Sequence, residues 1–111
     1  MKKNIYIILY FLISLFITTA VFSQEGWTQQ TSGTNNSFID VFFIDQNNGW
    51  ILGYDSTILI TTDSGTNWIS VSSGTSNVFS SVFFIDTEIG WCVGSSGTIL
   101  KSTDGGMNWS P

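Results

Sequence analysis

Four aspartates recur as two pairs in this chain, and paired carboxylates are the residues here that could do chemistry. Asp45 and Asp86 lie 41 positions apart, as do Asp63 and Asp104. Two carboxylates that flank a glycosidic bond can hydrolyse it, so a glycoside hydrolase is the first hypothesis to weigh. Asp45 and Asp86, however, hold equivalent places in two copies of one repeat. A role in capping the end of a strand suits them better, and we expect no catalytic residue.

The sequence lacks the histidines and paired cysteines that other catalytic sites and metal sites need. The sequence contains no His, and Cys92 is its only cysteine. A zinc site and a nucleophile activated by histidine are therefore excluded. One carboxylate in a turn falls short of the six to eight oxygens that calcium prefers, so we predict no metal and no cofactor. Cys92 takes the place of Ile51 in the other copy, which predicts a buried packing residue rather than a reactive thiol.

Asp63 and Asp104 belong to a short motif that occurs twice. Residues 61–68 read TTDSGTNW and residues 102–109 read STDGGMNW, so both fit [S/T]-x-D-x-G-x-x-W. An Asp side chain can accept hydrogen bonds from the amides just ahead of it and so fold a turn. Glycine supplies a backbone angle that a side chain would penalise, and tryptophan can cover the hairpin. The residues that we assign to this structural motif are Thr61, Asp63, Gly65, Trp68, Ser102, Asp104, Gly106 and Trp109.

The motif lies within a repeat of 41 residues. Residues 28–68 and 69–109 are identical at 21 of 41 positions without a gap, which marks them as copies of one unit. Each copy contains four apolar segments of strand length separated by polar turns. The expected strands are 38–44, 49–53, 57–60 and one from 67 onward, then 79–85, 90–94, 98–101 and one from 108 onward. A repeat of this length with four strands is typical of a β-propeller blade, so we predict an all-β fold with about two blades.

The repeat also predicts where side chains pack. The inner strands 38–44 and 79–85 are apolar without clean alternation, which predicts burial on both faces. Tryptophans recur at matching positions, and this favours core packing over an exposed sugar-binding surface. Ile60 in one copy is replaced by Lys101 in the other. That exchange predicts a position near solvent or at the rim of the blade.

The repeat and the start of the chain divide the sequence into segments. Residues 1–23 combine two lysines with an apolar stretch and a processing-like site, and we read them as a signal peptide; an uncleaved membrane anchor is the alternative. Residues 24–37 form a leading strand and linker, with Trp27 in an outer strand that would close a ring. Blade one covers 38–71 and a truncated blade two covers 72–111. Because a propeller needs at least four blades, we expect a fragment of a longer protein or, failing that, self-association.

Charge narrows the choice of partner. Beyond residue 23, Lys101 is the only base against all eight acids of the sequence, so this part has a net charge of −7. Such a surface repels phosphate backbones and anionic membranes, which excludes nucleic acid as a partner. With the signal peptide, the composition predicts an exported protein in the periplasm, at the cell surface or outside the cell, with no stable membrane span after cleavage.

The two motifs resemble the Asp-box of bacterial neuraminidase repeats. The fuller unit, F-x-D-x-x-x-G-W-x-x-G followed by a T-I-L strand and T-D-x-G-x-x-W, is similar to the repeats of the photosystem II assembly and stability factor family. The resemblance implies a propeller of about seven blades that acts as a non-enzymatic binding or assembly scaffold for a protein, or a glycan, at the cell envelope. The alternative is a fragment of a secreted carbohydrate-active, sialidase- or glucanase-like propeller whose catalytic residues lie outside this chain. A sialidase site needs an arginine cluster, and this chain has no Arg.

Overall fold

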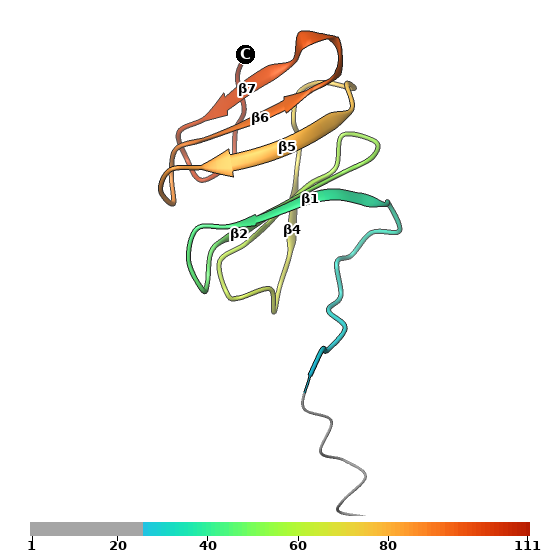
Figure 1. The fold of residues 1–111 in the computed structure, drawn as a ribbon, viewed down its shortest axis with the longest axis vertical. Helices are drawn as coiled ribbons and strands as arrows, with labels where there is room; N and C mark the ends of the chain where they lie inside the picture. The colour runs from blue at the N-terminus through green and yellow to red at the C-terminus, as the bar shows by residue number, and fades with distance from the viewer. Residues whose placement is uncertain (1–25) are drawn as a thin grey trace, which may run out of the picture.

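The computed structural model describes residues 26–111 and shows two antiparallel sheets (Figure 1). The predicted signal peptide lies outside the described residues. The first sheet contains β1 (Phe38–Phe43), β2 (Gly49–Gly53), β3 (Ile58–Thr61) and β4 (Ile69–Val71), and the second contains β5 (Phe79–Phe84), β6 (Gly90–Gly94) and β7 (Ile99–Ser102). Between β6 and β7 lies a single 3-10 turn, Ser95–Gly97. The all-β prediction is confirmed, and among the described residues no helix is long and apolar enough to cross a membrane.

Each strand pairs with the next strand in the sequence, in the order β1-β2-β3-β4 and β5-β6-β7. The second strands begin and end as predicted, and the inner and third strands differ from prediction by a residue at their ends. Both inner strands contain a bulge at the same place, between Phe38 and Asp40 and between Phe79 and Ser81. In the second sheet the fourth strand is reduced to a bridge between Lys101 and Ser110.

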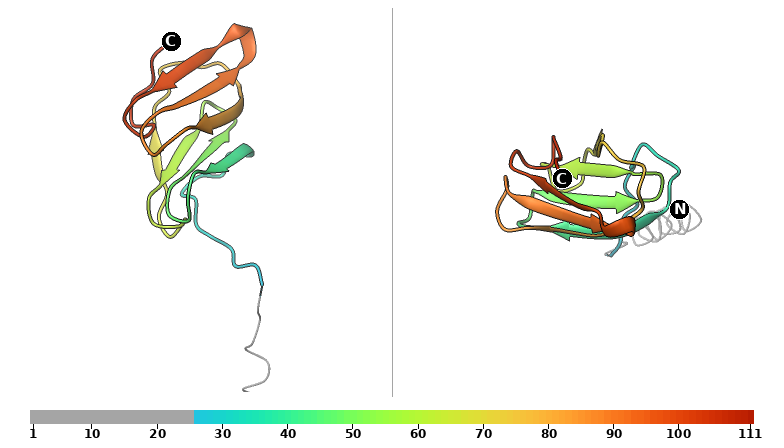
Figure 2. Two further views of the ribbon diagram at one scale, coloured as in Figure 1. Left: turned by 60° about the vertical axis from the view of Figure 1, so that its left-hand side comes forward. Right: turned by 90° about the horizontal axis from the view of Figure 1, so that it is seen from above.

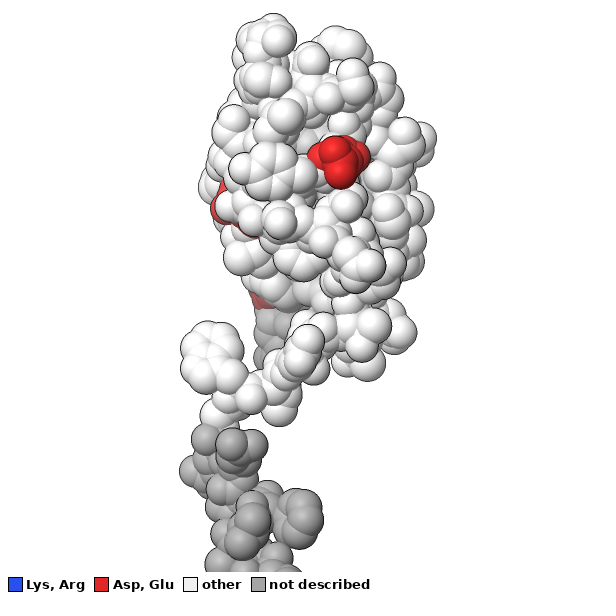
Figure 3. Space-filling model, turned by 90° about the vertical axis from the view of Figure 1, so that its right-hand side faces the viewer, with Lys and Arg blue, Asp and Glu red and all other residues white. Residues whose placement is uncertain are grey.

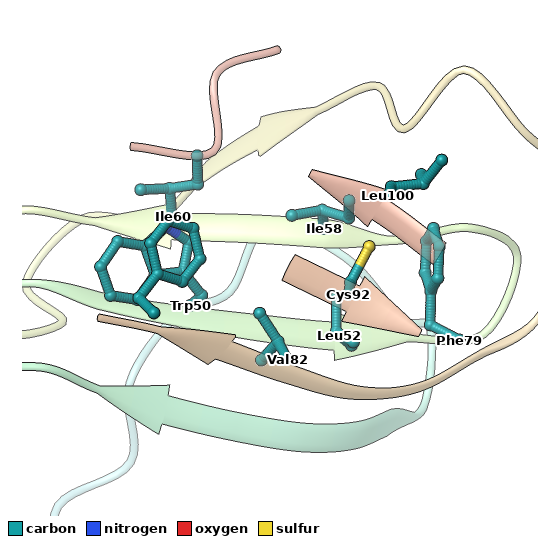
Figure 4. Packing of buried hydrophobic residues seen from close by; sticks show 9 residues of the cluster. Trp50, Leu52, Ile58, Ile60, Phe79, Val82, Cys92 and Leu100 are labelled. Carbon is teal, nitrogen blue, oxygen red and sulfur yellow. The ribbon is translucent and has the colours of Figure 1, made fainter. Parts of the chain in front are cut away.

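The core lies between the two sheets, which stack as layers (Figure 2). Side chains alternate across a strand, so each sheet has two faces. One face of the first sheet contributes Trp50, Leu52, Ile58 and Ile60, and the facing side of the second contributes Phe79, Val82, Phe84, Cys92 and Leu100 (Figure 4). We call this contact between the two sheets the joint. All nine side chains are buried, so the joint is the hydrophobic core of the described chain.

Two packing predictions are wrong, and both for the same reason. The inner strands are not buried on both faces, because within residues 26–111 each sheet has a neighbouring sheet on one side only. Val41 in β1 and Phe83 in β5 are 59% and 55% exposed. Ile60 does not lie near solvent but is buried in the joint, whereas Lys101, at the same place in the second blade, is exposed. Burial at this position depends on the neighbouring sheet and not on the position within the blade.

The leading segment 26–37 runs alongside the first sheet without joining it. Trp27 is fully exposed, and the described part of this segment contains no strand. The strand predicted there would complete a blade whose other strands are not among the described residues, so it stays a prediction. Residues 32–37 do match the connector between the blades in detail. Ser32 Oγ donates to the Thr34 carbonyl and Ser73 Oγ to the Thr75 carbonyl, each at 3.0 Å.

Candidate functional site: the Asp-box turns and the joint between blades

The first Asp-box turn connects β3 to β4 and is built around one carboxylate. Asp63 Oδ1 accepts hydrogen bonds from Thr61 Oγ1 and from the Asn67 amide, both at 2.9 Å. Thr61 Oγ1 in turn accepts from the Gly65 amide at 2.9 Å. Gly65 has φ +83°, a left-handed conformation that favours glycine. The turn is thus closed by side chains that pair with its own backbone.

The second Asp-box turn repeats this geometry after β7. Asp104 Oδ1 accepts from Ser102 Oγ at 2.8 Å and from the Asn108 amide at 2.9 Å. Ser102 Oγ accepts from the Gly106 amide at 2.8 Å, and Gly106 has φ +90°. Two turns with different residues at three of eight positions therefore adopt one hydrogen-bond pattern.

Sequence reasoning missed one member of each turn, the asparagine that precedes the tryptophan. Asn67 Nδ2 donates to Asp63 Oδ2 and Asn108 Nδ2 to Asp104 Oδ2, each at 2.8 Å. The second carboxylate oxygen is therefore engaged as well. The signal was present in the sequence, since Asn occurs at this place in both copies.

These bonds lower the pKa of both box carboxylates. For Asp63 the leading cause is the hydrogen bond from the Asn67 amide, and for Asp104 it is the bond from the Asn108 side chain. A hydrogen bond to the charged form of a carboxylate stabilises that form. Both groups are thus held as anions and as hydrogen-bond acceptors, which suits a turn and not a general acid.

The second pair of aspartates caps the turns that follow the inner strands. Asp45 Oδ1 accepts from the amides of Asn47 and Asn48 at 2.8 and 2.7 Å. Asp86 Oδ1 does the same for the amides of Glu88 and Ile89, at the same two distances. The pKa of Asp45 is lowered, first by the hydrogen bond from the Asn48 side chain. The predicted capping role is confirmed for both residues.

The joint brings the second Asp-box against the core of the first blade. The Trp50 ring stacks on Phe84 with centroids 3.6 Å apart and planes 7° apart, and Phe84 meets Trp109 edge to face at 5.9 Å. Trp50 Nε1 donates to the Gly105 carbonyl at 2.8 Å. A Cβ on Gly106 would lie 2.9 Å from Trp50 Nε1, so the glycine leaves the room that the indole needs. The box motif therefore serves blade packing as well as the turn.

A polar contact also crosses the joint at the inner strands. Asp40 Oδ2 accepts from Ser81 Oγ at 3.0 Å and from the Val82 amide at 2.9 Å. The bulge after Phe38 precedes this residue and changes the register there. Sequence reasoning gave Asp40 no role, because Ser81 replaces it in the other copy.

Among residues 26–111, each sheet has one face that no other sheet covers, and these open faces are largely apolar, although Leu59 on the outer face of β3 is buried. On the first blade, an open groove of about 620 Å³ is lined by aromatic and aliphatic side chains, among them Trp27, Phe38, Val41, Phe43 and Trp68. Figure 3 shows a side of the molecule on which nearly all atoms belong to uncharged residues. Among residues 26–111 the only base is Lys101, whose Nζ lies 5.5 Å from the centre of the Trp91 ring.

No candidate metal or thiol site emerges from the described residues. Within 26–111, no group of three His, Cys, Asp or Glu side chains could hold a metal ion. Cys92 is buried in the joint, as predicted, and this burial raises the pKa of its thiol to about 11. A thiol of that pKa is protonated at neutral pH and is a poor nucleophile.

Comparison with known proteins identifies the family to which these repeats belong. The family model described as "Photosynthesis system II assembly factor YCF48" matches residues 19–111. The chain belongs to the YCF48 family. Two solved structures resemble it, one described as "YCF48 bound to D1 peptide" and the other as "YCF48 from Cyanidioschyzon merolae". No curated protein is similar enough to count as a match.

The likeness to the two YCF48 structures is close but partial. Both are 32% identical to this chain, with TM-scores of 0.70 and 0.66. The matches cover 80% and 78% of this chain, but the chain spans only 29% and 26% of those proteins. The sequence-based resemblance to the photosystem II assembly factors and the propeller-blade fold class are thereby confirmed.

Proposed function

We propose that this YCF48-family chain is an exported, non-enzymatic scaffold that binds a segment of a partner protein at the cell envelope. The observation that carries the proposal is that the repeated aspartates of the chain are engaged in hydrogen bonds within turns. Asp45, Asp63, Asp86 and Asp104 each accept hydrogen bonds from amides of their own turn. Carboxylates held in this way stabilise turns and are not free to act in catalysis. We propose that all eight Asp-box residues likewise have structural roles, in the turn or in its packing.

Family membership supports a protein partner. One of the similar structures is described as YCF48 bound to D1 peptide, so a member of this fold family holds a peptide. The surface of the present chain suits a ligand with apolar side chains, because twelve large hydrophobic side chains among residues 26–111 are exposed. Binding through apolar side chains and backbone groups needs no cofactor. For this chain a peptide is thus the expected ligand, and no photosynthetic partner is implied.

Export rests on the sequence alone. The lysines at positions 2 and 3, the apolar stretch and the processing-like site ahead of Gln24 form the pattern of a signal peptide. Mass spectrometry of the protein recovered from the periplasm or medium of an expressing bacterium tests this. A mature N-terminus at Gln24 is expected, and an intact N-terminus in the membrane fraction would favour the anchor.

The experiment that tests the scaffold function presents the purified chain with two ligand classes in parallel. A peptide display library is selected against the immobilised chain, and a glycan array is probed with the labelled chain. We expect an enriched peptide consensus, which synthetic peptides then confirm by calorimetry. Binding to glycans alone, or turnover of fluorogenic glycosides, would replace the scaffold by the carbohydrate-active alternative.

A further inference from the structure

The turn between β1 and β2 contains an asparagine followed by a glycine, Asn48-Gly49, and no other asparagine in the sequence is followed by glycine. Because glycine has no side chain, its backbone nitrogen is the least hindered in a chain, and the side chain of a preceding asparagine reaches it most easily. The turn residues 45–47 are exposed, so water has access to the site. This pair can therefore undergo a covalent reaction that the other asparagines resist.

Packing of the blade fixes the glycine of this pair. The Phe43 ring lies over Gly49, and a Cβ there would be 2.5 Å from the ring atom Cζ. A Cβ on Gly90, in the second blade, would meet the equivalent phenylalanine ring just as closely. Each blade thus requires glycine at this place, and the residue before it decides whether the pair is reactive. That residue is Asn48 in the first blade and Ile89 in the second.

The turn itself does not need an asparagine side chain. Asp86 Oδ1 accepts from the Ile89 amide at 2.7 Å, which is also the distance between Asp45 Oδ1 and the Asn48 amide. The carbonyl of each of these two residues also accepts the hydrogen bond that closes its hairpin, at 3.1 and 3.0 Å. The second blade therefore builds the same turn around a residue that has no side-chain amide.

Two features of the fold restrain the reactive pair. Asn48 Nδ2 donates to both carboxylate oxygens of Asp45, at 3.0 and 2.9 Å. This side-chain bond is the leading cause of the lowered pKa of Asp45, so the amide and the charged carboxylate stabilise each other. Gly49 is buried and paired in the sheet with Phe43 and Thr61. A reaction between the two residues thus requires this end of the hairpin to open locally.

We propose that Asn48 is a site of spontaneous deamidation and that Asp45 restrains the reaction. When the hairpin end opens, the Gly49 backbone nitrogen attacks Cγ of Asn48. The new C–N bond closes a succinimide ring, the Cγ–Nδ2 bond breaks, and Nδ2 leaves as ammonia with the proton that Gly49 loses. Water then opens the ring at one of its two carbonyl carbons. Attack at Cγ gives aspartate, and attack at the main-chain carbon gives isoaspartate, in which the chain runs through Cγ.

Both products weaken the turn of the first blade. Each replaces the two hydrogen bonds from Nδ2 by a second carboxylate beside Asp45, and like charges at this separation repel. Isoaspartate also lengthens the main chain ahead of Gly49 and so displaces this residue relative to its partners in the sheet. Refolding cannot reverse the change, and the second blade is spared because Ile89 has no amide to lose.

The experiment incubates the full 111-residue chain in mildly alkaline buffer and follows each asparagine by mass spectrometry of chymotryptic peptides. We expect conversion of amide to acid at Asn48 before any other asparagine, with isoaspartate identified by electron-transfer fragmentation. The chain unfolded in guanidinium chloride should react faster, because its turn is always open. Asp104-Gly105 can close the same ring, but it starts from an acid and so does not produce this change in mass.

Three variants test the restraint. Asp45→Ala should speed the conversion at Asn48 about tenfold, close to the weight of one hydrogen bond to a charged group. Asp86→Ala is the matched control, because it removes the same cap from the second blade and should leave the rate at Asn48 unchanged. Asn48→Ile introduces the residue of the second blade and should abolish the reaction while circular dichroism shows the fold intact. If Asp45→Ala is unfolded, Asp45→Ser replaces it, since a hydroxyl can still accept from the turn amides without a charge.

Three results would overturn the proposal. The first is an Asn48 that stays an amide in the folded chain after about a hundred half-lives of the unfolded chain, because the turn would then open too rarely for the reaction. The second is faster conversion at another asparagine of the folded chain. The third is an equal rate at Asn48 in the wild type and in a folded Asp45 variant, which would remove Asp45 as the restraint.

Discussion

The two blades are copies of one unit, yet their equivalent residues have different surroundings. Trp50 is buried in the joint and donates to the Gly105 carbonyl, whereas Trp91 is only half-buried beside Lys101. Phe42 packs against the core and its equivalent Phe83 is 55% exposed. The turns, in contrast, keep the same hydrogen bonds in both copies. Local structure thus follows the repeat, and burial follows the neighbouring sheet.

This contrast identifies the interactions on which the stability of the described chain depends. Each Asp-box turn closes with bonds among residues six or fewer positions apart, so it needs no neighbour. The joint contains nine buried apolar side chains and joins residues far apart in the sequence, such as Trp50 and Gly105, which are 55 positions apart. Substitutions in the joint should therefore lower the free energy of unfolding more than the same substitutions on an open face.

The largest effect is expected when the two blades exchange the residue at one equivalent position. Ile60→Lys places an unpaired ammonium group in the joint and should lower the free energy of unfolding by about 3–5 kcal/mol. The reverse exchange, Lys101→Ile, lies on an open face and should change it by less than about 0.5 kcal/mol. Urea denaturation followed by tryptophan fluorescence measures both. Equal losses in the two variants would show that the neighbour does not decide burial.

A smaller effect is expected from a methyl group at the glycine of each Asp-box. Gly65→Ala and Gly106→Ala both impose left-handed strain, which costs about 1–2 kcal/mol. Gly106→Ala should cost more, because the new Cβ meets the Trp50 ring in the joint rather than the flexible Gln30 side chain. The difference between the two denaturation midpoints is the quantity to compare. A greater loss for Gly65→Ala would contradict the role given to Gly106.

Removing one hydrogen bond of the joint should have a still smaller effect. Trp50→Phe keeps an aromatic ring but loses the donor to the Gly105 carbonyl, at a cost of about 1 kcal/mol for the bond itself. Within residues 26–111 the Trp91 Nε1 has no hydrogen-bond acceptor like the one that Trp50 finds in the Gly105 carbonyl. Trp91→Phe should therefore leave the free energy of unfolding of the monomer nearly unchanged. Thermal unfolding at a concentration that keeps the chain monomeric gives the comparison. A loss for Trp91→Phe that matches the loss for Trp50→Phe would argue against the hydrogen bond.

The smallest effect on the free energy of unfolding is expected from protonation of Asp63 and Asp104, the Asp-box carboxylates, which make the same hydrogen bonds in both blades. The pKa of Asp63 and of Asp104 is lowered by folding, so their contribution is fully present above the ordinary value of 3.8 and is lost as the pH falls through the folded value. Denaturation midpoints measured from pH 7 to pH 2 should fall at the acid end. In the double variant Asp63→Asn, Asp104→Asn that acid-dependent part should shrink, and an unchanged profile would exclude the box carboxylates as its source.

The sequence predicts the repeating parts of this molecule well and the contacts between repeats poorly. The strand order, the two turns and the capping by Asp45 and Asp86 follow from short-range patterns that occur twice. The burial of Ile60 does not follow from such a pattern. Lys101 replaces Ile60 on a face that no other sheet covers within the described residues, and the sequence does not show which faces are covered. The same holds for Asp40, whose bonds to Ser81 and Val82 cross from one blade to the other. Asn67 and Asn108 were predictable, since both copies contain them.

The pairing of every strand with its neighbour in the sequence has a consequence for how the chain folds. Each sheet closes through short turns, so little loop entropy opposes its formation and the contacts within a blade are local. The first sheet can form while the second is still being synthesised, and the joint then forms by docking of preformed units. Folding speed should accordingly be set within a blade and should change little as blades are added.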